Sequence, residues 1–174
     1  MTEREPHYRQ VPPGELPEIV RHEVHVVVDN IRSAYNVGSI FRTADAGAAA
    51  HIHLCGMAAH PPHPKLEKTA LGAFAYVPWT YHERTKDAFA ALRETGIPIV
   101  AVELTDDAVS YLDFDWPRPV AIVLGNEVNG IHPRNLRRCD AVVKIPMFGF
   151  KNSINVATAF GVVFYGILDR WGAR

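Results

Sequence analysis

Cysteine is scarce in this sequence, and its scarcity excludes one class of protein. The 174 residues contain 2 cysteines, Cys55 and Cys139, far apart and in no metal-binding or redox spacing. A disulfide-stapled secreted domain is therefore excluded, and the cytoplasm is the expected compartment. The first residues are charged and proline-rich, without the apolar segment of a signal peptide or anchor. We expect no membrane as a partner.

Net charge is almost absent as well. Lysine and arginine together number 18, aspartate and glutamate 19, and the formal net charge is −1. No overall positive field draws nucleic acid to this protein. Any such binding must therefore be local.

Two common nucleotide-binding signatures are missing. No G-x-G-x-x-G follows the first predicted strand, and no G-x-x-x-x-G-K-[ST] occurs. These absences argue against an ordinary dinucleotide enzyme and a P-loop NTPase. The residue types that bind zinc are present on one predicted strand and in the proline-rich loop after it, at His51, His53, Cys55, His60 and His63. We nevertheless expect no metal, because one strand face and such a loop do not form a tetrahedral site.

The sequence does contain short apolar runs that alternate with amphipathic ones. Runs such as PVAIVL are typical of parallel strands buried on both faces. Strands or extended segments are predicted at 23–30, 51–54, 75–81, 97–104, 119–124 and 141–145. Helices are predicted at 37–46, 66–73, 83–95, 106–112, 133–138 and 154–168. The pattern indicates an α/β protein with an irregular lead-in at 1–22 and a single domain at 23–174.

The last predicted helix is apolar almost all the way round. Ser153 is its expected N-cap, because a serine hydroxyl accepts hydrogen bonds from the first helical turn. At about 1.5 Å per residue the helix is roughly 22 Å long, shorter than the ~30 Å hydrocarbon core of a membrane. It is therefore predicted to be a buried helix. Because one domain of this size covers such a helix only in part, a second copy is expected to bury the rest.

Polar or glycine-rich segments follow three predicted strands, at 36–42, 125–130 and 149–155. In parallel sheets, ligands bind beyond the carboxyl ends of the strands. Gly125 directly follows a buried strand, where it lets the backbone approach a flat ligand closely. Together with apolar side chains such as Ile145 and Ile154, two such segments suit an adenine ring. The alternative, that these segments are plain turns, stays open at this point.

Three sequence motifs carry a resemblance to a known family. The segments NIRSAYNVGSIFRTADA, VLGNEVNGI and KIPMFGFKNSINVATAFG resemble, in order and spacing, the motifs of the SpoU (TrmH-like) family of SPOUT RNA 2′-O-ribose methyltransferases. The resemblance covers about 24–168. It implies a Rossmann-like α/β fold, with a mostly parallel sheet flanked by helices and a C-terminal trefoil knot. It also implies a homodimer that uses S-adenosylmethionine to methylate a ribose 2′-hydroxyl, in tRNA first and in rRNA as the alternative.

The resemblance marks three groups of residues. The catalytic group is predicted to be Arg42, Asn36, Glu127, Ser153 and Asn155. The cofactor is predicted to contact Val102, Leu124, Gly125, Asn126, Gly130, Ile145, Met147, Ile154 and Asn155. RNA contacts are predicted for Arg32, Arg42, Arg134 and Lys151. The remaining basic residues near the motifs, Arg137, Arg138 and Lys144, either contact phosphates too or form a solvated face.

The chemistry implied for Arg42 can be weighed directly. Methylation of a hydroxyl requires its alignment with the methyl donor and the removal of one proton. Because an arginine is almost never deprotonated, we expect Arg42 to bind the neighbouring phosphate and to stabilise the developing oxyanion. The alternative is a surface ion pair with Asp45. For Asn155 the alternative is a plain capping role. Glu127 either orients Arg42 or Asn155 or is a solvated loop carboxylate.

Two functions of other classes also stay open. The chain is either the methyltransferase implied by the resemblance, a non-catalytic RNA-binding relative, or a small-molecule α/β enzyme that uses another nucleotide. The motif residues Asn36, Arg42, Glu127 and Asn155 argue against the non-catalytic relative.

Overall fold

A computed structural model describes residues 18–173, so most of the predicted lead-in lies outside the described residues. In this part of the chain, seven strands form one sheet in the order β3-β2-β1-β6-β4-β7-β5. They are β1 (His22–Asp29), β2 (Ala49–Cys55), β3 (Trp79–His82), β4 (Ile99–Val102), β5 (Val109–Ser110), β6 (Val120–Leu124) and β7 (Ala141–Lys144). Each neighbouring pair is parallel. The predicted α/β class with a parallel sheet is confirmed, whereas the knot stays a prediction.

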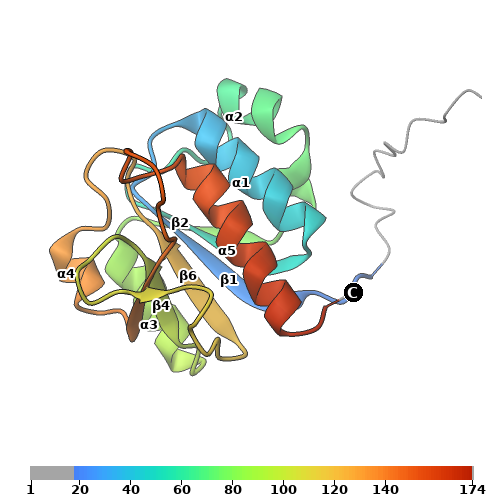
Figure 1. Ribbon diagram of the computed structural model, residues 1–174. Coiled ribbons are helices and arrows are strands. Elements are labelled where there is room, and N and C mark those ends of the chain that lie inside the picture. Colours follow the sequence, from blue (N-terminus) through green and yellow to red (C-terminus); the bar gives the residue numbers. More distant parts are fainter. Residues whose placement is uncertain (1–17, 174) are drawn as a thin grey trace, which may run out of the picture.

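Helices cover both faces of the sheet (Figure 1). They are α1 (Ala34–Ala46), α2 (Pro64–Ala70), the 3-10 turn η2 (Ala73–Ala75), α3 (Thr85–Glu94), α4 (Pro133–Leu136) and α5 (Val156–Arg170). On one face α1 and α5 lie side by side, with α2 against α1 (Figure 1). α3 packs on the other face, where its Ala88, Phe89 and Leu92 are buried.

The core has two halves, one on each side of the sheet. Val26 of β1 packs into the half beneath α1 and α5, and Val27 packs into the half beneath α3. Phe160 and Phe164 of α5 stack with their ring centroids 5.2 Å apart. Burial of each such side chain stabilises the fold by about 1.5–3 kcal/mol. This packing holds the strands rigidly and brings their carboxyl ends to one edge, where the polar segments lie.

The prediction of a helix at 106–112 is wrong. These residues form a turn followed by β5, whose Ser110 pairs in parallel with Lys144 of β7. The backbone N–H of Tyr111 donates to the Lys144 carbonyl at 3.0 Å. Pairing with the open edge of β7 satisfies backbone groups that a short, isolated helix would leave to water, so tertiary context overrides local pattern.

The predicted starts of two helices are also wrong. α5 begins at Val156 and its N-cap is Asn155, whose Oδ1 accepts from the N–H groups of Ala157 and Thr158 at 2.9 and 3.3 Å. Ser153 is therefore not the cap, because asparagine caps equally well and its position suits the turn. α1 begins at Ala34 and is capped by Ser33, so the expected loop at 36–42 is helical.

The apolar surface of α5 is covered on one side. Its fully or almost fully buried residues are Phe160, Val163, Phe164, Ile167 and Leu168. Tyr165 retains 49% of its exposure, so α5 is not enclosed on every side within one chain. No helix in residues 18–173 has both the length and the apolar character needed to cross a membrane.

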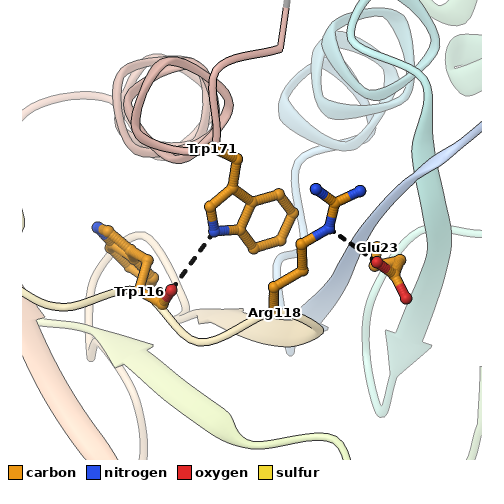
Figure 2. Close-up of polar contacts among 4 residues, drawn as sticks. All are labelled: Glu23, Trp116, Arg118 and Trp171. Carbon is orange, nitrogen blue, oxygen red and sulfur yellow. Dashed lines mark hydrogen bonds and ion pairs between the residues drawn. The ribbon is translucent and has the colours of Figure 1, made fainter.

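The carboxyl end of α5 is fastened to the amino ends of the central strands (Figure 2). Trp171 Nε1 donates to the Trp116 carbonyl at 3.4 Å, and the Arg118 guanidinium carbon lies 5.2 Å from the centroid of the Trp171 ring. Arg118 Nε also donates to Glu23 Oε2 at 2.8 Å. The exposed ion pair and the cation–π contact each stabilise by about 1 kcal/mol or less. This end of α5 lies opposite the edge that carries the polar segments.

Candidate active site

A cavity of about 620 Å³ opens at the carboxyl ends of β4, β6 and β7. The walls come from the strand ends, from the loop after β6 and from the segment that leads into α5. All nine residues predicted to contact the cofactor line it: Val102, Leu124, Gly125, Asn126, Gly130, Ile145, Met147, Ile154 and Asn155. The volume lies within the ~300–1,000 Å³ of small-ligand pockets. The tertiary structure thus gathers one residue set from three distant segments, and their role in binding stays a prediction.

The loop after β6 is a tight turn that requires glycine at both ends. A Cβ on Gly125 would lie 2.5 Å from the backbone of Gly130 and Ile131, and Gly130 has a φ of +64°. The backbone groups of Asn126 and Gly130 exchange hydrogen bonds of 2.9 and 3.1 Å. With no side chain at Gly125, the main chain itself forms the cavity wall there, which suits a flat ring held by backbone groups and by the apolar Leu124 and Ile145.

Asn126 serves this loop rather than pointing freely into the cavity. Its Oδ1 accepts from the N–H groups of Val128 and Asn129 at 3.0 and 3.1 Å. Its Nδ2 donates to the carbonyl of Asn30, at the end of β1, at 2.8 Å. The side chain therefore uses both of its polar groups to hold the loop against the sheet.

Glu103 is a cavity residue that sequence reasoning missed. Its Oε2 accepts from the N–H of Ile131 and its Oε1 from the N–H of Leu104, both at 2.8 Å. The carboxylate faces the cavity and also supports the turn at Gly130. The available signal was its place directly after the buried strand β4, the same position that marked Gly125 after β6.

A chain of hydrogen bonds joins the three sequence motifs. Asn36 Nδ2 donates to Glu127 Oε1 at 2.9 Å, and Asn155 Nδ2 donates to Asn36 Oδ1 at 2.9 Å. Glu127 also accepts from the backbone N–H groups of Arg32 and Ser33, at 3.3 and 3.2 Å. The carboxylate thus holds Asn36 and reaches Asn155 only through it. The alternative that Glu127 is simply a solvated loop carboxylate is wrong, and its link to Asn155 runs through Asn36.

Electrostatics keep Glu127 ionised. Partial burial raises its pKa, but the hydrogen bonds from Asn36 and from the backbone of its own loop, Ser33 and Arg32 outweigh burial, so the pKa is lowered overall. A carboxylate with a lowered pKa and several donors is a weak base. Its arrangement suits positioning better than proton removal.

Not all of the predicted catalytic residues meet at the cavity. Glu127, Ser153 and Asn155 line it, and Asn36 lies behind Asn155. Arg42 is exposed on α1 and is not part of the lining. Within residues 18–173 it forms no ion pair with Asp45, whose pKa is raised by burial and lowered in part by Arg21. The surface ion pair considered for Arg42 is therefore not formed.

The predicted RNA-binding residues are spread over one copy of the chain. Arg32 is exposed beside Glu127, Arg134 lies at a second pocket, and Lys151 lines a hollow of about 570 Å³ next to the cavity. Lys144 lines both the cavity and that hollow. One copy alone does not gather these cations into a single groove.

The histidines considered for zinc have structural partners. His53 lies between His25 and His82, with nitrogen–nitrogen distances of 3.3 and 3.1 Å. His60 stacks on Tyr81, and His63 caps α2. Among residues 18–173, no group of three or more His, Cys, Asp or Glu side chains is arranged to hold a metal ion.

Comparisons with known proteins agree with this geometry. The sequence profile described as the SpoU rRNA Methylase family matches residues 23–165. The tRNA (guanosine(18)-2′-O)-methyltransferase of Thermus thermophilus is 29% identical over 155 residues, which are 86% of this chain and 78% of the relative. The enzyme of the same name from Escherichia coli is 31% identical, over 82% of this chain and 62% of the relative.

A solved structure extends the likeness to three dimensions. The crystal structure of AdoMet-bound rRNA methyltransferase from Sinorhizobium meliloti superimposes with a TM-score of 0.79 at 29% sequence identity. The match covers 93% of this chain and 61% of that one. The chain thus spans less than two thirds of the Escherichia coli and Sinorhizobium proteins, and about three quarters of the Thermus enzyme.

Proposed function

Because the chain belongs to the SpoU rRNA Methylase family, we propose that it is an S-adenosylmethionine-dependent RNA methyltransferase that acts on a ribose 2′-hydroxyl. The observation that carries the proposal is the hydrogen-bonded chain Glu127–Asn36–Asn155, which joins all three motifs at the mouth of the cavity. The names of the Thermus and Escherichia relatives support tRNA as the substrate. The cytoplasm is its proposed compartment.

The cavity fits the proposed cofactor. S-adenosylmethionine combines a flat adenine, a ribose and a charged methionine end, and when bound it supplies an electrophilic methyl group. The backbone turn at Gly125 and the apolar Leu124 and Ile145 would hold the adenine. Asn155, which lines the cavity at the start of α5, would face the incoming ribose.

The residues around the mouth mainly align the reacting hydroxyl. Glu127 fixes Asn36, Asn36 fixes Asn155, and Asn155 is also locked by its capping bonds, so this side chain is oriented before the substrate arrives. Such preorganisation lowers the barrier by positioning. The new bond would join the ribose oxygen to the methyl carbon as the bond from that carbon to the sulfonium sulfur breaks. S-adenosylhomocysteine would be the leaving group, and the hydroxyl proton would pass to water or to an RNA phosphate.

Arg42 is proposed to act across a dimer. It lies outside its own cavity, on α1, which packs along α5, and α5 keeps Tyr165 exposed. A second copy placed on this surface would cover α5 and bring an arginine to each cavity. There the guanidinium would bind the phosphate beside the target ribose and stabilise the developing oxyanion.

Methyl transfer from labelled S-adenosylmethionine to bulk tRNA tests the function. We expect label in nucleotides whose 3′ linkage resists alkaline cleavage, since alkali requires a free 2′-hydroxyl. Label in bases instead would contradict ribose methylation. Binding of tRNA without transfer would indicate a non-catalytic relative, and calorimetry that favours NAD or ATP over S-adenosylhomocysteine would indicate another nucleotide enzyme.

A further inference from the structure

A second pocket, here named the α3–α4 pocket, lies at the same edge of the sheet as the cavity. It has a volume of about 480 Å³ and lies between the start of α3, the start of α4 and the ends of β1 and β2. Its cationic lining residues are Arg84, Lys86, Arg134 and Arg138. The sequence analysis had named Arg134 and Arg138 as possible phosphate contacts, and the cavity described above does not include any of the four.

Nearby carboxylates, the buried Asp29 among them, offset part of the positive charge of this pocket. Glu83 is the acidic residue in its lining, and Arg84 Nε lies 3.1 Å from Asp87 Oδ2. Within residues 18–173, Lys86, Arg134 and Arg138 form no ion pair. A protein whose net charge is −1 thus concentrates cations in one concave place. Such a concentration attracts an anion of matching shape.

The walls of the α3–α4 pocket are held together by one buried carboxylate. Asp29, only 1% exposed, accepts from Thr85 Oγ1 at 2.5 Å, from Asn30 Nδ2 at 2.7 Å and from Asn135 Nδ2 at 3.0 Å. These donors belong to α3, to the end of β1 and to α4. The pocket is therefore preformed, so the free-energy cost of ordering its residues on binding would be small.

A hydrogen bond joins the lining of the pocket to the lining of the cavity. Asn30 lines the α3–α4 pocket, and its carbonyl accepts from Asn126 Nδ2 in the loop that lines the cavity. In the sheet, β1 neighbours β6, and β6 neighbours β4. Adjacent strands lie ~4.8 Å apart, so the two sites are separated by roughly the width of two strands. One polymeric ligand can reach both.

An aromatic platform stands beside the pocket. Tyr81 Oη donates to the carbonyl of the pocket-lining Gly56 at 3.0 Å, and His60 stacks on Tyr81 with ring centroids 4.2 Å apart. Both side chains are exposed. Cations that contact phosphates, with exposed rings on which bases stack, are the combination that binds single-stranded nucleic acid. A free phosphate or an acidic peptide would not need the rings.

We propose that the α3–α4 pocket binds a backbone phosphate of the substrate RNA, close to the nucleotide whose ribose enters the cavity, and that His60 and Tyr81 receive a neighbouring base. This inference rests on the proposed function for the RNA substrate. The pocket would be a second RNA-binding point, and it would set which nucleotides of the RNA lie over the cavity.

Direct binding of tRNA tests the proposal independently of catalysis. The double variant Arg134→Gln/Arg138→Gln should raise the Kd for tRNA about tenfold and reduce the slope of log Kd against log salt concentration by about one to two. Its affinity for S-adenosylhomocysteine should be unchanged, because neither residue lines the cavity. Arg137→Gln is the matched control, since this exposed neighbour on the same segment does not line the pocket.

The other outcomes are equally decisive. A double variant that binds tRNA with the affinity and salt slope of the wild type overturns the proposal, and so does an equal loss in Arg137→Gln. Inorganic phosphate that competes with tRNA at this pocket at micromolar concentration would overturn it in favour of a free-anion site. If the double variant unfolds, Lys86→Gln alone, on the exposed rim, replaces it and should show the smaller loss of one contact.

A separate variant tests the proposed stacking of a base on His60 and Tyr81. His60→Ala removes an exposed ring without touching the core and should weaken tRNA binding about fivefold or more, with an unchanged salt slope. If the wild type binds tRNA in this way but transfers no methyl group, the proposed function fails while the pocket stands. If it transfers methyl groups with no effect of these variants, the pocket fails while the function stands.

Discussion

Asn155 Nδ2 donates to Asn36 Oδ1 at 2.9 Å across 119 residues of sequence, and the same asparagine caps α5 through its Oδ1. One side chain thus sets the start of a helix and the link between the first and third motifs. The two roles use different atoms, so substitution can separate them.

We expect Asn155→Ser and Asn155→Ala to divide these roles. Serine still caps the helix, so the free energy of unfolding should change by only a few tenths of a kcal/mol, whereas alanine should cost about 1 kcal/mol. Both lose the bond to Asn36, so single-turnover methyl transfer should fall about 10- to 100-fold in each. Urea unfolding and single-turnover kinetics provide the measurements. A serine variant with full activity would remove the link from the mechanism.

Glu127→Gln should reduce transfer while leaving the fold in place. Glutamine presents an amide N–H where Glu127 accepts three hydrogen bonds, so Asn36 and the backbone of Arg32 and Ser33 lose part of their support. We expect a loss of stability of about 1 kcal/mol at neutral pH.

The pH dependence of that loss has a definite sign. Because the pKa of Glu127 is lowered in the folded state, its contribution is present above the unfolded pKa and is lost as the pH falls through the folded pKa. The stabilities of wild type and variant should therefore converge in acid. Urea titrations at pH 7 and pH 3.5 measure this, and a constant difference would contradict the role of the charge.

Arg42 variants should reveal whether the arginine acts between copies. Arg42→Ala should abolish most transfer yet bind S-adenosylhomocysteine normally, since the side chain lies outside the cavity of its own chain. If Arg42 serves the neighbouring copy, mixing Arg42→Ala with Asn155→Ala under conditions of subunit exchange should restore part of the activity, because one site in each mixed dimer is intact. No recovery in a mixture shown to exchange would mean that Arg42 acts within its own chain or not at all.

Arg42→Lys separates phosphate binding from proton removal. Lysine keeps the charge but cannot make the two-pronged contact of a guanidinium. We expect a large loss of kcat with the pH–rate profile unmoved. A nearly active lysine variant whose apparent pKa is shifted would instead indicate that this residue removes the proton.

The histidine row on β1, β2 and β3 should make stability depend on pH. Burial lowers the pKa of His53 to about 3 and that of His51 to about 4, with the neighbouring histidines contributing. Burial also lowers the pKa of His25 and of His82, the latter opposed by Asp87. An unfolded histidine titrates near ~6.5. Between that pH and about 4 the unfolded chain binds protons that the folded chain does not, so stability falls as the pH decreases.

The substitution His53→Gln should make the stability of the fold depend less on pH in this range. Glutamine does not titrate, so the loss of stability between pH 7 and pH 4.5 should be smaller than in the wild type, even if the variant is less stable at pH 7. The matched control is His60→Gln, at an exposed histidine outside the row. Equal slopes in wild type and His53→Gln would show that the row does not control acid stability.

Much of the sheet and the cofactor cavity could be predicted because their signals are local. Continuous apolar runs such as Val120 to Leu124 predict strands buried on both faces, and a glycine directly after such a strand marks a site edge. The resemblance carried by the order and spacing of the motifs then marked the residues expected to contact the cofactor. The nine predicted cofactor-binding residues accordingly surround one cavity.

Tertiary structure decided what depends on competition between distant partners. The segment 106–112 pairs with an open strand edge instead of forming a helix, and Asn155 rather than Ser153 caps α5 while its Nδ2 contacts Asn36. The α3–α4 pocket joins residues that are distant in sequence through the buried Asp29.

The sequence by itself determined the α/β class and most strand positions through periodicity, and its resemblance to a known family marked the residue set at the cavity. Only the tertiary structure decided which polar side chains pair, that Glu127 holds Asn36, and that Arg42 lies outside its own cavity. The physical reason is that a hydrogen bond or a charge is directional and short-ranged. Its partner is therefore set by where the folded backbone places each group, not by the residue type alone.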